Sequence, residues 1–273
     1  MKESTITIFD HNIWGGMPKD DRIANRNHLI AGLIDYHDAD VIAFQECSPK
    51  TSRAEENDIA ELLEPTYAEV ECGMGKDNHT PIFYKKERFS VISSGYFAYE
   101  RLNNGKSKSI TYAILEDKES FVRFGFISTH FWWKSDGKED DEVRMYNAET
   151  LSNYINTLKE KYDVPVFAMG DLNCGINSTQ DRAPYYHLKE RFLDTRDIAP
   201  ISTDLLSHHD LPKMNKDGIY TAEGRAEPER NLDYIFVTEH RNVAIDSFEV
   251  DSSDDAYASS DHFPLVVKAR VFG

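Results

Sequence analysis

The feature that most constrains the fold is a series of short apolar runs, rich in β-branched and aromatic residues, that recurs along the whole chain. Many runs alternate apolar with polar residues or are wholly apolar, as strands facing a packed layer are. We therefore predict ten strands, over Thr5–Phe9, Val41–Phe44, Thr66–Val70, Pro81–Tyr84, Ser109–Leu115, Val122–Thr129, Val164–Met169, Leu232–Val237, Ala244–Val250 and Leu265–Val271.

Three longer segments are predicted helices. Arg22–Tyr36 and Glu139–Lys159 place apolar side chains near helical spacing, and Thr51–Leu63 follows a Ser-Pro pair. No linker or repeat divides the chain, so we predict one domain over residues 1–273 with sheets stacked between helical layers. A four-layer α/β/β/α sandwich fits this count. The polar, irregular segment Leu193–Arg230 is predicted to form long surface loops.

The three cysteines, Cys47, Cys72 and Cys174, are scattered and lack CxxC spacing. We expect neither a disulfide framework nor a cysteine zinc site, and a cytoplasmic location, although a mature secreted chain would look much the same. Met1–Asp10 lacks the cationic start and apolar stretch of a signal peptide. No apolar run approaches the roughly 18–20 residues that cross a bilayer.

The formal net charge of −17 bears on the partner. A chain with this charge repels polyanions at long range, which disfavours duplex DNA. A local basic rim or a bound divalent cation can reverse the sign where it matters, so nucleic acid is not excluded.

Polar side chains that can bind a metal stand directly at the ends of several predicted strands. Strand ends are rigid, so carboxylates placed there can converge with little reorganisation. Taken singly, each residue has an ordinary alternative: a surface glutamate, a Gly-Asp-x-Asn turn, a cap or a packed histidine. Their repeated position at strand boundaries makes coincidence a poor explanation for the set: Glu46, His130, Asp171 with Asn173, Asp233, and Asp261 with His262.

These residues lie in segments that resemble the serial motifs of the endonuclease/exonuclease/phosphatase superfamily, the group with the pancreatic-deoxyribonuclease-like fold. The resemblance runs from about residue 5 to 271. It implies an α/β/β/α sandwich of two packed mixed, mainly antiparallel sheets, with the site at one edge. Two further segments, Pro81–Phe89 and Arg230–Val237, look most like bacterial members related to the deadenylase branch. The motif segments are Phe44-Gln45-Glu46, Thr129-His130, Gly170-Asp171-Leu172-Asn173, Leu232-Asp233-Tyr234 and Ser260-Asp261-His262-Phe263-Pro264-Leu265, with Asn12 matching the asparagine that opens the series.

Hydrolysis of a phosphate ester needs a group that neutralises the phosphoryl oxygens and a base that deprotonates water. Hard oxygen ligands suit Mg²⁺ or Mn²⁺, and Mg²⁺ keeps several waters while using one or two carboxylates. Glu46 is the predicted first metal ligand, with Asn12 and Asp261 near it. His262 is the predicted base, because imidazole titrates close to neutral pH.

The resemblance implies the remaining roles. Asp233 would orient His262 and stabilise its charged form. Asp171 would hold or help to activate the attacking water. Asn173 and His130 would donate hydrogen bonds to phosphoryl oxygens, and His130 could assist the leaving group.

Three further polar residues are candidates for binding substrate. Arg144 lies on the predicted helix after His130, where a guanidinium can clamp phosphate, but an exposed ion pair with neighbouring acids fits equally well. Asn78 and His79 precede the strand that begins at Pro81 and could line the substrate rim, although an ordinary polar loop is the favoured interpretation.

The tryptophans Trp14, Trp132 and Trp133 flank the predicted site and could stack a base or sugar, or pack in the core. Trp14 also marks a departure from the family pattern. The branches that repair abasic DNA carry an aspartate two positions after the opening asparagine, and Trp14 occupies that position here. This difference argues against a DNA-repair nuclease.

Three functions follow as hypotheses. The leading one is hydrolysis of a phosphate mono- or diester in a small molecule, such as a sugar, inositol, nucleotide or lipid head group, by a monomer. The second is a Mg²⁺-dependent nuclease acting on RNA or single-stranded DNA. The third, a binding module with a degenerate site, is disfavoured because the residue set is intact. A narrow pocket closed by Leu193–Arg230 would favour a small ester, and an open groove lined by Lys and Arg would favour nucleic acid.

Overall fold

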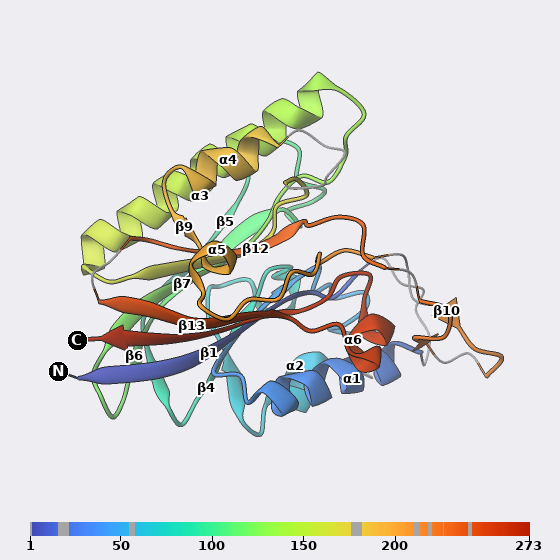
Figure 1. Ribbon diagram of the computed structural model, residues 1–273, viewed down its shortest axis with the longest axis horizontal. Helices are drawn as coiled ribbons and strands as arrows, with labels where there is room; N and C mark the ends of the chain where they lie inside the picture. Colours follow the sequence, from blue (N-terminus) through green and yellow to red (C-terminus); the bar gives the residue numbers. More distant parts are fainter. Residues whose placement is uncertain are drawn as a thin grey trace.

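Two six-stranded sheets form the centre of the computed structural model, and helices cover both outer faces (Figure 1). The structure describes residues 2–15, 22–54, 58–175, 182–209, 213–217, 220–225, 227–239 and 242–273. The predicted α/β/β/α sandwich of mixed, mainly antiparallel sheets is confirmed, since each sheet contains one parallel pair, β1 with β2 and β7 with β8, among antiparallel neighbours.

The first sheet has the order β13-β14-β1-β2-β4-β3. β1 pairs with β14 along almost its whole length, so the two ends of the chain lie side by side in one sheet (Figure 1). The prediction of a single domain is compatible with this pairing and stays a prediction. The strands are β1 (Glu3–Asn12), β2 (Val41–Gln45), β3 (Tyr67–Glu69), β4 (Ile82–Lys85), β13 (Val243–Val250) and β14 (Leu265–Phe272).

The second sheet has the order β5-β6-β7-β8-β12-β9. A separate two-stranded hairpin joins β10 (Lys213–Met214) to β11 (Tyr220–Thr221). The strands of the second sheet are β5 (Phe89–Ala98), β6 (Ser109–Asp117), β7 (Arg123–His130), β8 (Val166–Asp171), β9 (Leu193–Asp194) and β12 (Asp233–Val237).

The helices lie in two outer layers (Figure 1). On the second sheet lie the long α3 (Lys138–Tyr162) and α4 (Ala183–Lys189). On the first sheet lie α1 (Arg22–His37) and α2 (Ile59–Leu63), with α6 (Asp254–Ser259) against α1. Two short elements complete the set, α5 (Thr195–Ile198) and the 3₁₀ helix η1 (Gly75–Asp77).

The central strands are continuous apolar runs because alternate side chains along each strand pack into different apolar layers. Phe167 and Met169 of β8 face the core between the two sheets, whereas Val166 and Ala168 face the core beneath α3 and α4. Both faces of the strand are therefore covered by apolar layers, as in other sheets buried on two sides.

Every predicted strand is present, with ends that differ by a few residues, but β5 was not predicted. Its sequence is interrupted by Ser93-Ser94-Gly95, its register shifts between Val91 and Ser93, and most of its residues are only partly buried. As an edge strand it lacks the strong apolar pattern of a central one. The helix predicted over Thr51–Leu63 was too long: turns occupy 51–53, the helix is Ile59–Leu63, and residues 55–57 lie outside the described part.

The segment Leu193–Arg230, predicted as loops, also contains the short elements β9, α5, β10 and β11. All three cysteines are free thiols. Among the described residues, none of the helices is long and apolar enough to cross a membrane.

Candidate active site

Neighbouring strand ends bring the predicted site residues of the second sheet together. β7 ends at His130, β8 ends at Asp171, and β12 begins at Asp233. In the sheet register Asp171 lies beside His130 on one side and beside Asp233 on the other. Three groups that are far apart in sequence therefore form one row at a single edge of the sheet.

The first sheet supplies the facing row. Asn12, at the end of β1, lies beside Gln45, and Glu46 follows directly. Asn12 Nδ2 donates a hydrogen bond to Asp171 Oδ2 over 2.9 Å, which joins the two sheets at the site. The Asn12 side-chain oxygen accepts the backbone N–H of Trp14 at 3.1 Å.

Asp171 is the centre of this network. Its Oδ2 also accepts from Asn173 Nδ2 at 3.2 Å, and its Oδ1 accepts the backbone N–H of Asn173 at 2.7 Å. Burial alone would raise the pKa of Asp171, but the neighbouring His130, 3.4 Å away, and the positive charge of His262 outweigh burial and lower it. Asp171 is therefore ionised at neutral pH.

Asp233 and His262 form a buried acid–imidazole pair. His262 Nδ1 lies 2.8 Å from Asp233 Oδ2, and Ser207 Oγ donates to the same oxygen at 2.6 Å. The backbone N–H groups of Leu232 and Asp233 in turn donate to Ser207 Oγ at 3.1 Å. Sequence reasoning missed Ser207, which lies in a loop segment with no motif of its own.

The pair leaves His262 Nε2 as the reactive nitrogen, 3.9 Å from Asp261 and 4.0 Å from Asp171. Burial lowers the pKa of His262, but the charge and hydrogen bond of Asp233, with the charges of Asp261 and Asp171, raise it to about 10. His262 therefore holds a proton at neutral pH while these carboxylates are ionised.

His130 is held by a lysine that sequence reasoning did not single out. Lys108 Nζ lies 2.5 Å from His130 Nε2, and Asn173 Nδ2 lies 3.1 Å from the same nitrogen. Because an ammonium has no lone pair, the imidazole accepts this hydrogen bond, and burial together with Lys108 lowers the pKa of His130. In this arrangement Lys108 provides donors where the resemblance implied His130 would.

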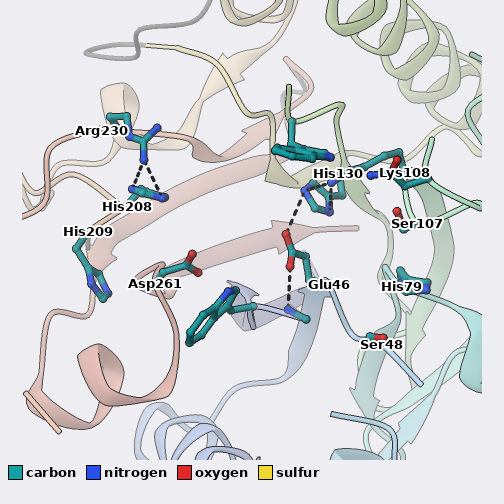
Figure 2. A pocket seen from close by; sticks show the side chains of 14 residues that line it. Glu46, Ser48, His79, Ser107, Lys108, His130, His208, His209, Arg230 and Asp261 are labelled. Carbon is teal, nitrogen blue, oxygen red and sulfur yellow. Dashed lines mark hydrogen bonds and ion pairs between the residues drawn. The ribbon is translucent and has the colours of Figure 1, made fainter. Parts of the chain in front are cut away.

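These groups lie at or beneath the floor of a pocket of about 780 Å³. Figure 2 shows Glu46 and Asp261 near its middle, Lys108 and His130 on one wall, and His208 and Arg230 on the opposite wall. Of the predicted residues, Glu46, His79, His130 and Asp261 line the pocket, together with Trp14, Gly15, Ser48, Asn104, Ser107, Lys108, Trp133, His208, His209 and Arg230.

Two predicted substrate-binding residues are not among those that line the pocket. Arg144 is fully buried and donates to the Lys134 carbonyl and to Asp141. Asn78 is also fully buried, and its side-chain oxygen accepts from Thr80 N at 3.0 Å. Both side chains are used in packing, whereas His79, next to Asn78, reaches the pocket.

The site offers oxygen ligands for a divalent cation. Glu46 and Asp261 line the pocket, and Asn12, at the end of β1, pairs with Gln45, the residue directly before Glu46. Burial, together with the charges of Glu46 and Asp171 and against the opposing charge of His262, raises the pKa of Asp261 to about 6. An all-oxygen donor set of this kind fits Mg²⁺ or Mn²⁺.

Two other groups of ligating atoms lie within 4.8 Å of one another: His208, Asp261 and His262, and Asp171, Asp233 and His262. In both groups His262 already pairs with Asp233 through Nδ1. Arg230 in turn approaches the ring of His208 at 3.1 Å, so that imidazole accepts from a guanidinium. The Glu46–Asp261 side is therefore the better-fitting candidate site for a cation.

The chain is similar in structure to proteins of one superfamily. An endonuclease/exonuclease/phosphatase family protein from Bacteroides thetaiotaomicron matches with a TM-score of 0.76 and 21% identity over 99% of this chain and 96% of that one. A mannosyl-6-phosphatase from the same organism matches with a TM-score of 0.75 and 22% identity over 98% and 100%. D. rerio TDP2, complexed with a single-strand DNA product, matches with a TM-score of 0.68 and 15% identity over 97% and 99%. No protein-family model and no curated protein sequence matches the chain.

Proposed function

We propose that this chain, which has the fold of the endonuclease/exonuclease/phosphatase superfamily, is a divalent-metal-dependent hydrolase of phosphate esters in small molecules. The observation that carries the proposal is the buried Asp233–His262 pair, whose free Nε2 faces Asp171 next to a pocket lined by Glu46 and Asp261. This arrangement combines a proton-transfer group with a cation site at one sheet edge.

In the proposed mechanism Glu46 and Asp261, with Asn12, would hold Mg²⁺ or Mn²⁺. A cation bound there would supply positive charge that offsets the negative charge of the phosphoryl oxygens. Asp171, fixed by Asn12 and Asn173, orients the attacking water.

His262 Nε2 is proposed to take the proton from that water, and Asp233 holds the ring and stabilises its charged form. Its raised pKa opposes this role as long as the surrounding carboxylates are ionised. The negative charge of Asp261 is one cause of the raised pKa of His262. A cation bound to Asp261 would offset this charge and so move the pKa of His262 back toward neutral pH.

The pocket supports a small substrate over a polynucleotide. Lys108 and Arg230 are the only Lys or Arg side chains among its described lining residues, and Lys108 is buried. Ser48, Asn104 and Ser107 offer hydroxyl and amide groups that suit a polyol. His208 and His209, in the segment that follows α5, line the pocket together with Arg230.

A nuclease acting on single strands is the second candidate. It is favoured by Trp14 and the half-exposed Trp133, both of which line the pocket and can stack a base. Trp132, in contrast, is buried and donates to Asp140.

The test is a panel of phosphomonoesters, phosphodiesters and RNA and DNA oligonucleotides, assayed with Mg²⁺ or Mn²⁺. We expect His262→Ala to lower kcat by about 10³-fold, because general base catalysis typically contributes 10²–10⁴-fold. His28→Ala, on the exposed face of α1, is the matched control and should leave turnover unchanged.

Turnover by His262→Ala equal to that of the unmodified enzyme would remove His262 from the mechanism. The pH profile then tests its specific role. A base gives activity that rises with pH up to the pKa of His262, whereas activity that falls over this range would show that the protonated form is required.

A further inference from the structure

Lys108 is a buried cation that no carboxylate of the described residues contacts. Its side chain is 3% exposed, and its Nζ contacts His130 at 2.5 and 3.1 Å. Among the described residues, no carboxylate oxygen lies within 4.0 Å of this nitrogen. Glu46 and Asp171 act on it only from a greater distance, as charges.

An ammonium group has three N–H donors, and the neutral imidazole of His130 has one acceptor nitrogen, so His130 cannot accept all three hydrogen bonds. Burying a charge without a close counter-charge costs free energy, and an anion that reaches the charged group offsets part of this cost. Lys108 borders the pocket beside Ser107, so an anion in the pocket can reach it. Burial lowers the pKa of Lys108 to about 8, against the opposing charges of Glu46 and Asp171, which leaves most of it protonated at pH 7.

We propose that Lys108 binds a non-bridging oxygen of a terminal phosphoryl group, and that it makes the enzyme a phosphomonoesterase. This inference rests on the proposed hydrolase function and narrows its substrate. A monoester carries a dianionic phosphoryl group with three non-bridging oxygens, whereas a diester carries one charge and two such oxygens. In this proposal the third non-bridging oxygen of a monoester accepts a hydrogen bond from the Lys108 ammonium. In a diester the second ester substituent occupies this position and places carbon next to the ammonium.

The other cation of the pocket does not offer this contact. Arg230 lies on the opposite wall, where its guanidinium approaches both ring nitrogens of His208 at 3.1 Å (Figure 2). Lys108 is the cation on the wall of His130, the residue that the family resemblance implies would lie at the phosphoryl group.

The reaction balances as a hydrolysis. The oxygen of water forms the new bond to phosphorus, and the bond between phosphorus and the leaving oxygen breaks. One water proton passes to His262, and the leaving alkoxide takes up a proton from solvent to give the alcohol. His262 then returns its proton to solvent, so the products are the alcohol and inorganic phosphate. Lys108 changes neither its bonds nor its charge in this step.

The experiment compares 4-nitrophenyl phosphate with bis(4-nitrophenyl) phosphate in the presence of Mg²⁺ or Mn²⁺. We expect the unmodified enzyme to prefer the monoester in kcat/KM. Lys108→Met should lower this value about 100-fold for the monoester and less than about 3-fold for the diester, because a charge-assisted hydrogen bond in a buried site is lost only by the monoester. Lys108→Arg should restore most of the loss.

Lys106→Met is the matched control, because Lys106 is exposed in the same turn and does not line the pocket. It should change neither substrate's kcat/KM. Unfolding temperatures of all three variants check that the fold is retained, and Lys108→Arg separates loss of charge from loss of packing.

Equal losses on both esters in Lys108→Met, or a preference of the unmodified enzyme for the diester, would overturn the assignment while leaving the hydrolase proposal intact. Binding of inorganic phosphate with Mg²⁺, followed by calorimetry, tests Lys108 independently of turnover. Lys108→Met should weaken it at least about 10-fold. Unchanged phosphate affinity would also overturn the assignment, whereas absence of hydrolysis of either ester by the unmodified enzyme would instead contradict the hydrolase proposal.

Discussion

Glu46 adopts a left-handed backbone conformation, with φ of +58°, directly after β2. Such a conformation is uncommon for a residue other than glycine and is retained where surrounding contacts hold it. Here the Gly15 N–H donates to Glu46 Oε2 at 2.8 Å, and Oε1 lies 3.9 Å from His130. Burial raises the pKa of Glu46, but His130, Lys108 and Gly15 together lower it, so the carboxylate is charged, as the proposed metal ligand must be.

Replacing this single carboxylate tests the cation site. Glu46→Gln keeps the shape of the side chain and removes its charge, so we expect the Mg²⁺ concentration that gives half-maximal activity to rise about 10-fold or more. Titration of activity with Mg²⁺ measures this change. Glu71→Gln, at an exposed position, should leave the titration unchanged, and an unmoved midpoint in Glu46→Gln would mean that Glu46 is not a ligand.

At the scale of the elements, β8 depends on the glycine that precedes Asp171. Gly170 has φ of +143°, and a Cβ at this position would lie 1.9 Å from the Thr129 carbonyl oxygen. Thr129 and Gly170 are partners in the parallel pairing of β7 with β8. The absence of a side chain thus allows the two strands to approach and sets Asp171 beside His130.

We expect Gly170→Ala to lower the free energy of unfolding by about 3 kcal/mol, because the added methyl group must displace backbone. Urea denaturation measures the change. Gly32→Ala is the matched substitution in α1, where a Cβ would meet nothing within 4 Å, and it should raise the free energy of unfolding by about 0.5–1 kcal/mol. Equal stability of the two variants would show that β7 and β8 do not need this close approach.

In the molecule as a whole, a small polar cluster crosses the apolar layer between the two sheets. Gln45 Nε2 donates to Asp10 Oδ1 at 2.8 Å and to Ser128 Oγ at 3.3 Å, and Ser128 Oγ donates to the Phe44 carbonyl at 3.0 Å. Asp10 Oδ2 has no hydrogen-bond partner among the described residues. Burial, with a further contribution from the charge of Asp233, raises the pKa of Asp10 well above its usual range.

This cluster predicts a stability that depends on pH. The folded protein holds the Asp10 proton more tightly than the unfolded chain does. The contribution of this proton to the free energy of unfolding is therefore fully present below the pKa of Asp10 in the unfolded chain, and it is lost as the pH rises through the pKa of Asp10 in the folded protein. The loss amounts to at most about 1.4 kcal/mol per pH unit between the two pKa values. Asp10→Asn should remove this dependence and give a higher Tm than the unmodified protein at pH 8, both measured in EDTA. An identical pH dependence in the variant would show that Asp10 is charged in the fold.

The strands of the sandwich and much of the candidate site could be predicted from local sequence patterns. Hydrophobic alternation is local information, and so is the position of a polar residue at a strand end. Glu46, His130 and Asp171 could be selected in this way because the strand that carries each one also points it to the shared edge. The acid–imidazole pairing of Asp233 with His262, inferred from resemblance, is also found in the structure, at 2.8 Å.

Which other side chains contact these residues could not be predicted from the sequence, because those contacts join segments that are far apart along the chain. Lys108 and Ser207 lie in polar segments without a motif, and they reach the site because the start of β6 and the segment after α5 bring them there. Arg144 and Asn78 had chemistry suited to a phosphate, yet the fold buries both and uses their hydrogen bonds internally. Spacing along a chain fixes which residues share a strand or a helix, whereas contact across sheets and loops depends on packing of the whole molecule.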